Sequence, residues 1–243
     1  MRMLTFASRN TKELIRDPLT VLFGLGFPVV LLLLLSAIQS SVPVSLFEIH
    51  HLTPGITVFG LSFISLFSAT MISRDRTTSF LQRLYTTPLT PLDFILGYTL
   101  PLVPLSVAQS IVCYGVALIL GLELSASILL ALVLIIPISL LFIAIGLLFG
   151  SILNDKQVGG ICGALLTNFS AWLSGTWFEL ELVGGTFKKI AYALPFVHAV
   201  EMERAAISGN LSAILPHLWW VLGYAIATLA LAVLLFLRQM KKQ

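Results

Sequence analysis

The side chains that could carry out chemistry gather between residues 174 and 204. His198 and Glu201 are three residues apart and would share one face of a helix, so they could both bind a metal ion. A metal site needs three or four ligands, however, and His50 or His51 would have to join them. We therefore favour interfacial polar residues over metal ligands, and we predict no metal.

The sequence lacks the usual motifs for nucleotide binding and for hydrolase chemistry. The glycine-rich stretch 184–189 reads Gly-Gly-Thr-Phe-Lys-Lys, which does not have the spacing that cradles nucleotide phosphates. No His-Glu-x-x-His and no Gly-x-Ser-x-Gly occurs, and Ser174 is interpreted as a small residue at a helix end. We predict no catalytic residue and no cofactor-binding residue in this chain.

One enzymatic alternative stays open, namely a membrane enzyme that acts on a lipid-linked substrate. Such an enzyme needs acid and base groups that converge at one membrane surface. The side chains that could supply them are Glu179, Glu181, His198, Glu201 and Glu203.

Composition places the chain in a membrane. Of its 243 residues 58% are hydrophobic and only 10% are charged, whereas a soluble domain carries about 25% charged residues. The net charge of +3 and the absence of a basic stripe with interleaved aromatic residues argue against a nucleic-acid partner. Cys113 and Cys162 lie in apolar stretches and are interpreted as packing residues.

Six apolar segments are about long enough to cross a bilayer as helices. They cover residues 19–39, 54–73, 95–120, 127–150, 158–178 and 216–237. The sequence thus predicts an all-α integral membrane protein, with residues 1–243 forming a single transmembrane domain. Kinks are expected at the prolines inside these segments.

The distribution of basic residues predicts the orientation. If the N-terminus is inside the cell, all of the 14 Lys and Arg residues except Lys188, Lys189 and Arg204 fall on the cytoplasmic side. Cytoplasmic loops are enriched in these residues. We therefore predict a multi-pass protein of the plasma (inner) membrane with both termini in the cytoplasm.

Three segments remain outside the spans. Residues 1–18 are amphipathic and predict a helix that lies in the inner interface in contact with membrane lipid. Residues 74–93 form a cytoplasmic loop. Residues 179–215 are too polar for a span, and we expect short re-entrant helices that dip into the outer leaflet.

The spans lack ionisable side chains at their centres, where Gln109 and Asn168 are the main polar residues. Ion-coupled carriers place charged groups at that depth, so the energy for any transport should come from elsewhere. Small residues recur in Gly146-x-x-x-Gly150 and Gly159-x-x-x-Gly163. This spacing favours close helix packing, either within one chain or between two copies.

The loop at 74–90 reads Arg-Asp-Arg-Thr-Thr-Ser-Phe-Leu-Gln-Arg-Leu-Tyr-Thr-Thr-Pro-Leu-Thr. It resembles the first cytoplasmic loop of ABC type-2 exporter permeases, where an acidic-Arg pair precedes Gly-Thr-Leu-Glu-Arg-Leu and Thr-Pro-Leu. Asp75-Arg76, residues 81–84 and residues 87–89 match this pattern, whereas Ser79 and Phe80 depart from the Gly-Thr pair.

A second stretch looks like the same family. Residues 173–175 read Leu-Ser-Gly, residues 191–195 read Ala-Tyr-Ala-Leu-Pro, and an acidic residue and Arg204 follow. Glu179 and Val183 stand where the family commonly has proline. The residues of the outer segment that the resemblance singles out are Pro195, His198, Glu201 and Arg204.

The resemblance implies a coupling helix, at about residues 78–86, that docks on a separate ATPase subunit. Its apolar face would suit a groove in that partner, and a helix lying on the lipid surface is the alternative. Pro88 would end the helix. The predicted coupling residues are Asp75, Arg76, Phe80, Leu81, Gln82, Arg83, Leu84, Tyr85 and Pro88.

The resemblance also implies a function, that of the membrane-spanning subunit of an ATP-driven ABC exporter. Two ABC ATPase subunits would bind ATP and Mg²⁺, and a second permease copy or a paralogue would complete the assembly. An amphipathic, drug-like or lipid-like substrate would leave by alternating access. A non-transporting anchor subunit is the alternative. The candidate substrate path holds Phe63, Phe67, Asn168 and Trp172, for which core packing is an equal explanation.

Overall fold

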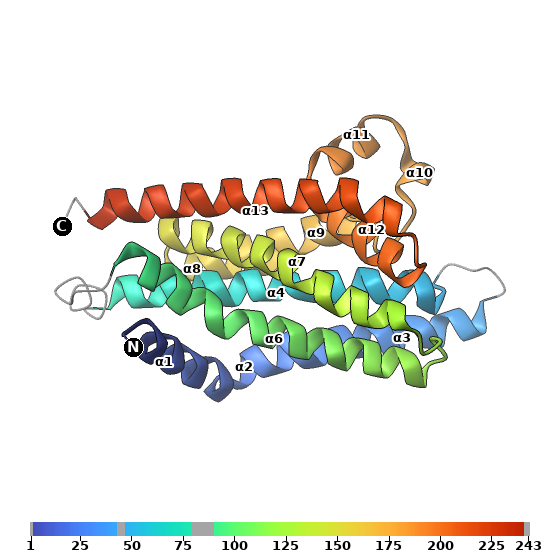
Figure 1. Ribbon diagram of the computed structural model, residues 1–243, viewed down its shortest axis with the longest axis horizontal. Helices are drawn as coiled ribbons and strands as arrows, with labels where there is room; N and C mark the ends of the chain where they lie inside the picture. The colour runs from blue at the N-terminus through green and yellow to red at the C-terminus, as the bar shows by residue number, and fades with distance from the viewer. Residues whose placement is uncertain (1, 43–46, 79–89, 241–243) are drawn as a thin grey trace.

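The computed structural model describes residues 2–42, 47–78 and 90–240, and within these ranges it contains helices and no strand. Long helices run side by side along one direction (Figure 1). Both chain ends lie at the same end of this bundle, which we call the terminal end, and the other is called the opposite end. The predicted all-α class is confirmed.

Among the described residues, five helices are long and apolar enough to cross a membrane. The predicted spans 19–39, 54–73, 95–120, 127–150 and 216–237 each fall on one of them. Their bounds are Pro18–Ser41 (α2 Pro18–Val21, η1 Leu22–Gly26 and α3 Phe27–Ser41), α4 Ile49–Thr77, α6 Pro91–Ile119, α7 Ala126–Ile152 and α13 Leu211–Met240. The chain is therefore a multi-pass membrane protein.

The predicted fifth span, 158–178, differs from the other five. It is helical through α8 (Asp155–Val158), the π-helix η2 (Gly159–Leu166) and α9 (Thr167–Leu173), and then turns. In the described part of the chain it is not among the helices that meet the length and apolarity of a span. The segment is shorter and carries Lys156 and Asn168, so a sixth span stays a prediction.

Helix α4 forms the centre of the bundle. In its most apolar stretch 89% of the residues are buried, against 17% for α13. A methyl group added at Gly146 of α7 would lie 2.3 Å from the Ser65 carbonyl oxygen, and one at Gly150 would lie 2.6 Å from that of Ala69. The Gly146-x-x-x-Gly150 face therefore packs within the chain, and only glycine permits this approach of α7 to α4.

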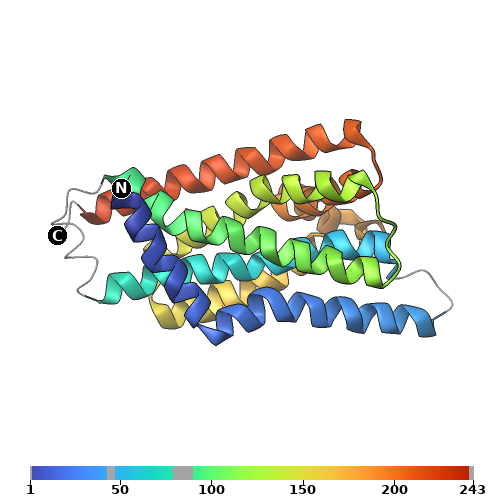
Figure 2. The same cartoon turned by 60° about the horizontal axis from the view of Figure 1, so that its bottom comes forward.

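Helix α1 (Arg2–Arg16) does not run with the bundle but crosses the helices obliquely at the terminal end (Figure 2). Asp17 separates it from α2 and caps that helix, because its carboxylate accepts a hydrogen bond from the Leu19 N–H at 3.1 Å. The predicted amphipathic N-terminal helix thus exists. Its position in a membrane interface stays a prediction.

Short helices lie at the opposite end, within the predicted outer segment 179–215, and their re-entry into the outer leaflet stays a prediction. They are α10 (Leu180–Val183), α11 (Gly185–Ala193) and α12 (Pro195–Ile207). The last span begins earlier than predicted, at Leu211, because Pro216 lies inside α13 and does not begin it. Prolines are tolerated inside membrane helices when other groups satisfy the freed carbonyls.

Candidate functional site

Three helices meet at the described residues on either side of segment 79–89. Helix α4 ends at Thr77, α6 begins at Pro91, and α1 crosses both helices beside these ends. Segment 79–89 lies outside the described residues. The predicted coupling residues within it therefore stay predictions, namely Phe80, Leu81, Gln82, Arg83, Leu84, Tyr85 and Pro88.

Asp75 joins the three helices. Its side chain is almost fully buried, and Arg9 of α1 donates to both carboxylate oxygens at 2.8 and 3.0 Å. The hydroxyl of Tyr98 on α6 donates to the same carboxylate at 2.8 Å. Bidentate Arg–carboxylate pairs are strong and geometrically specific. Asp75 was predicted to belong to the coupling loop, and in this structure its carboxylate is directed into the bundle.

A second set of contacts seats α1 on α6. Pro101 has no N–H, so the carbonyl of Gly97 lacks its helical donor, and Asn10 donates its side-chain amide to that oxygen at 2.9 Å. The ring of Phe6 covers Gly97, where an added methyl group would lie 2.2 Å from a ring carbon. Phe6 also packs edge-on against Tyr98, with ring centroids 5.0 Å apart.

We call the contacts of Phe6, Arg9 and Asn10 with Asp75, Gly97 and Tyr98 the α1 junction. They combine one ion pair, two buried hydrogen bonds and a ring packed into a glycine notch. The junction lies directly at the base of segment 79–89, since Asp75 is three residues before Thr78, the last described residue before that segment.

Arg76 fastens the same end of α4 to α7. Its guanidinium donates to the carbonyl oxygens of Gly150 at 2.8 Å and Leu153 at 3.4 Å. Carbonyls in the last turn of a helix lack helical donors, so Arg76 satisfies the end of α7. Arg74 also forms an ion pair with Asp155 of α8 at 3.5 Å. The base of the loop is thus joined to α1, α6, α7 and α8.

The opposite end of the bundle holds a cavity of about 390 Å³. Arg204 lies at its wall, where it pairs with Glu201 at 2.8 Å and donates to the Gly175 carbonyl at 2.8 Å. The wall also includes Glu179 and Trp177. Two residues of the predicted outer set, Glu201 and Arg204, therefore come together here.

The other two members of that set lie elsewhere. Pro195 begins α12, and His198 lies one turn later. The two Nδ1 atoms of His198 and His217 are 2.8 Å apart, and the His198 ring stacks on Trp220 with centroids 4.8 Å apart. Burial lowers the pKa of His198. In the described ranges no three metal-binding side chains converge, and the neighbour of His198 is His217 and not the suggested His50 or His51.

The sequence pointed to Glu203 only as one of the acid groups of the enzymatic alternative, and in the described part of the chain it is the most enclosed carboxyl. Its side chain is fully buried, and the Tyr114 hydroxyl donates to one carboxylate oxygen at 2.6 Å. The other oxygen has no partner. Burial raises the pKa of Glu203 to about 8. Glu203 does not line the cavity, whereas the other three carboxyls of the enzymatic alternative, those of Glu179, Glu181 and Glu201, do line it.

The four residues of the predicted substrate path fall into two environments. Phe63 and Phe67 are buried, whereas Asn168 and Trp172 are exposed on the segment formed by η2 and α9. The amide of Asn168 donates to the Ala164 carbonyl in its own helix at 2.8 Å. Rings that pack on Phe63 at 5.4–5.8 Å belong to Phe23, Phe27 and Phe59.

The chain matches a known protein family. The model of the family described as ABC-2 type transporter matches residues 2–207. This range includes α1, the α1 junction, segment 79–89 and the cavity at the opposite end. No curated protein matches the chain.

Proposed function

The chain belongs to the ABC-2 type transporter family, and from this premise we propose that it is the membrane-spanning subunit of an ATP-driven exporter. Membrane domains of this family are transport subunits, and nucleotide binding generally belongs to an ATPase partner. In the proposed complex, ATP and Mg²⁺ are bound by that partner, which supplies the energy. This chain spans the membrane and provides the path for the substrate.

The observation that carries this proposal is the way in which the base of segment 79–89 is anchored. Asp75 connects it to α1 and α6, Arg76 to α7 and Arg74 to α8. A force that an ATPase applies to the loop would therefore reach four neighbouring helices through directional contacts. We propose that residues 80–85 dock on the ATPase and that Asp75 and Arg76 pass the movement to the bundle.

Helix α4 connects the terminal end of the bundle to the opposite end. It is the most buried of the five apolar helices. Near its start the Gly55 carbonyl accepts a hydrogen bond from Thr176 at 3.4 Å, beside the cavity. We propose that movement at the terminal end, which the basic residues assign to the cytoplasm, changes access at the opposite end. In this proposal the packed helices move as rigid bodies and give the substrate path alternating access to the two sides of the membrane.

The exposed side of η2 and α9 is the proposed face toward the substrate and a second subunit. Asn168 places an exposed amide in a mostly apolar segment, and lipid hydrocarbon offers this amide no hydrogen-bond partner. Trp172 is 52% exposed on the same segment. A second copy or a paralogue would cover this face, and the mixture of apolar and polar groups suits an amphipathic or lipid-like substrate.

The docking step is tested by purifying the tagged chain gently from its native membrane. We expect an ATPase subunit to copurify, and the double variant Leu81→Asp, Leu84→Asp to lose it by roughly tenfold or more because charges replace the apolar docking face. The control is Leu124→Asp, Leu182→Asp, which changes two highly exposed leucines at the opposite end. An ATPase that is retained equally by both variants would refute the coupling loop, and no ATPase at all would refute the exporter.

A further inference from the structure

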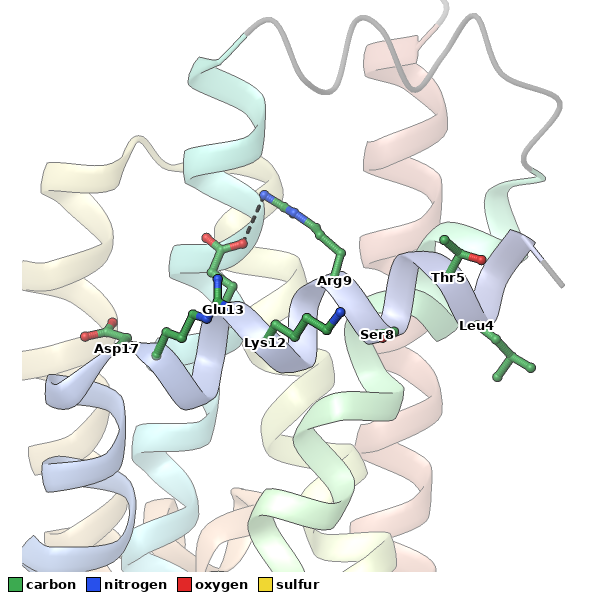
Figure 3. Close-up of a pocket in the computed structure, with 8 residues that line it drawn as sticks. Leu4, Thr5, Ser8, Arg9, Lys12, Glu13 and Asp17 are labelled. Atoms are coloured by element: carbon green, nitrogen blue, oxygen red, sulfur yellow. Dashed lines mark ion pairs between the residues drawn. The ribbon is translucent and has the colours of Figure 1, made fainter.

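The outward side of α1 carries a face that neither the α1 junction nor the proposed transport cycle uses. Figure 3 shows this face, on the side of α1 turned away from the bundle, with Leu4, Ser8, Lys12 and Glu13 among the side chains drawn. The side chains that line the face belong to α1 and to Asp17, which follows it.

Two basic side chains on this face form no ion pair with a described carboxylate. Arg9 is neutralised by Asp75 at 2.8 Å and by Glu13 at 2.9 Å, and Asp17 caps α2. Lys12 and Arg16 are both exposed, and neither has a carboxylate partner among the described residues. They are four residues apart, so they lie one above the other along the helix. The side chains that line the face carry three positive and two negative charges, and the exposed Lys12 and Arg16 are the groups that an anion would meet.

Apolar side chains border these charges on one side. Leu4 is 59% exposed and Ile15 is 69% exposed. Eleven residues make about three turns of a helix, so the two lie on one stripe. In Figure 3 Leu4 points along the bundle, away from the end of α4, whereas Arg9 and Glu13 point toward that end.

The side chains around α1 thus change from apolar to charged in the direction of the terminal end. In Figure 3 Leu4 is turned away from the terminal end, and the Arg9–Glu13 pair is turned toward it. By their spacing along the helix, Ile15 lies beside Leu4, and Lys12 and Arg16 lie between this stripe and the ion pair. A helix at a lipid surface shows this gradation, because its apolar side enters the acyl region and its basic side chains reach the headgroups.

We propose that this face of α1 is a binding site for an anionic phospholipid of the cytoplasmic leaflet. The lipid phosphate accepts hydrogen bonds from the Lys12 ammonium and the Arg16 guanidinium, with the exposed Ser8 hydroxyl beside them. An acyl chain packs along Leu4 and Ile15. The site rests on the proposed orientation, with the terminal end in the cytoplasm. It ties α1, and through the α1 junction the base of the coupling loop, to the charge of the membrane.

The test uses native mass spectrometry of the purified full-length chain with added phosphatidylglycerol or phosphatidylcholine. We expect a preference for phosphatidylglycerol of about fivefold for each basic side chain, the usual effect of a Lys or Arg near an anionic surface. Lys12→Glu, Arg16→Glu should abolish the preference, whereas Lys12→Arg, Arg16→Lys should keep it and thereby show that α1 tolerates substitution there.

A matched control separates the site from net charge. Lys156→Glu, Lys189→Glu changes the charge by the same amount at two exposed positions on other helices, and it should retain most of the preference. Equal binding of the two lipids by the unaltered chain, or an unchanged preference in Lys12→Glu, Arg16→Glu, would overturn the proposal.

A protein partner would give a different pattern. If Lys12→Glu, Arg16→Glu loses the copurifying ATPase but keeps its preference for phosphatidylglycerol, the face docks a protein and the lipid proposal is wrong. The lipid measurement is made without the ATPase. A negative lipid result would therefore leave the copurification test with Leu81→Asp, Leu84→Asp, and the proposed function that it tests, unaffected.

Discussion

At the scale of single residues, several polar groups of this chain fasten helices to one another. Asp75 joins three helices, Arg76 satisfies the end of α7, and Arg204 links α12 to the turn at Gly175. Glu203 also links α12 to Tyr114 of α6, but its second oxygen is buried without a partner. A buried acid of this kind is stable in its neutral form.

Glu203 should make stability depend on pH. Its pKa is raised from the ordinary 4.5 to about 8 in the folded chain, so between these values the unfolded carboxyl is ionised while the folded one holds its proton. Stability is therefore highest below pH 4.5 and falls as the pH rises to about 8. We expect Glu203→Gln, which keeps the neutral shape, to be more stable than the unaltered chain at pH 9, on the order of a few kcal/mol.

The stability difference between Glu203→Gln and the unaltered chain should shrink as the pH approaches 4.5. Thermal unfolding midpoints of both proteins at pH 5, 7 and 9 measure this difference. The control is Glu123→Gln at an exposed position, where no pH-dependent gain is expected. A Glu203→Gln variant that is less stable than the unaltered chain at every pH would mean that the carboxylate is ionised and needed in the folded chain.

At the scale of elements, the attachment of α1 to α6 depends on a glycine and a proline of α6. Gly97 has no side chain, and Pro101 has no backbone N–H. Gly97 leaves room for the Phe6 ring, and Pro101 frees the carbonyl that Asn10 binds. The same feature explains why α6 carries a proline in its interior without an unpaired carbonyl at this position. The junction therefore consists of contacts that are far apart in sequence.

Gly97→Ala should detach α1. The added methyl group would meet the Phe6 ring at 2.2 Å, and overpacking of this kind costs about 1–3 kcal/mol. Faster proteolysis and faster hydrogen exchange within residues 2–16 would report it. Gly115→Ala in the same helix is the control, because nothing lies within 4 Å of the added group. Adding Phe6→Ala to Gly97→Ala should partly restore the protection of residues 2–16. Absence of this rescue would contradict the packing of the Phe6 ring on Gly97.

The sequence predicted the elements better than their contacts. Apolar segments of bilayer length identified all five spans, because length and composition alone define a helix in lipid. The α1 junction was missed, because neither Asn10 nor Gly97 has a sequence signal that points to the other. His198 was likewise considered with His50 and His51, whereas the fold brings it to His217. Segment 79–89 was identified by resemblance and lies outside the described residues.

At the scale of the whole molecule, α4 connects the two ends of the bundle. Its terminal end is anchored by Asp75 and Arg76, its middle packs on the glycines of α7, and its opposite end contacts Thr176 beside the cavity. Protein interiors are close-packed and transmit displacement. The central claim is therefore that movement of the coupling loop reaches the opposite end through the α1 junction and α4.

The most direct test is the distance between two copies at the opposite end, measured by electron spin resonance with spin labels at Leu124→Cys. The buried free cysteines Cys113 and Cys162 are replaced by alanine, and the complex with its ATPase is compared with and without ATP. We predict an ATP-dependent change of distance that is largely lost in Asp75→Asn, although ATP is still hydrolysed. An unaltered change in Asp75→Asn, or no change in the active complex, would contradict transmission through the junction.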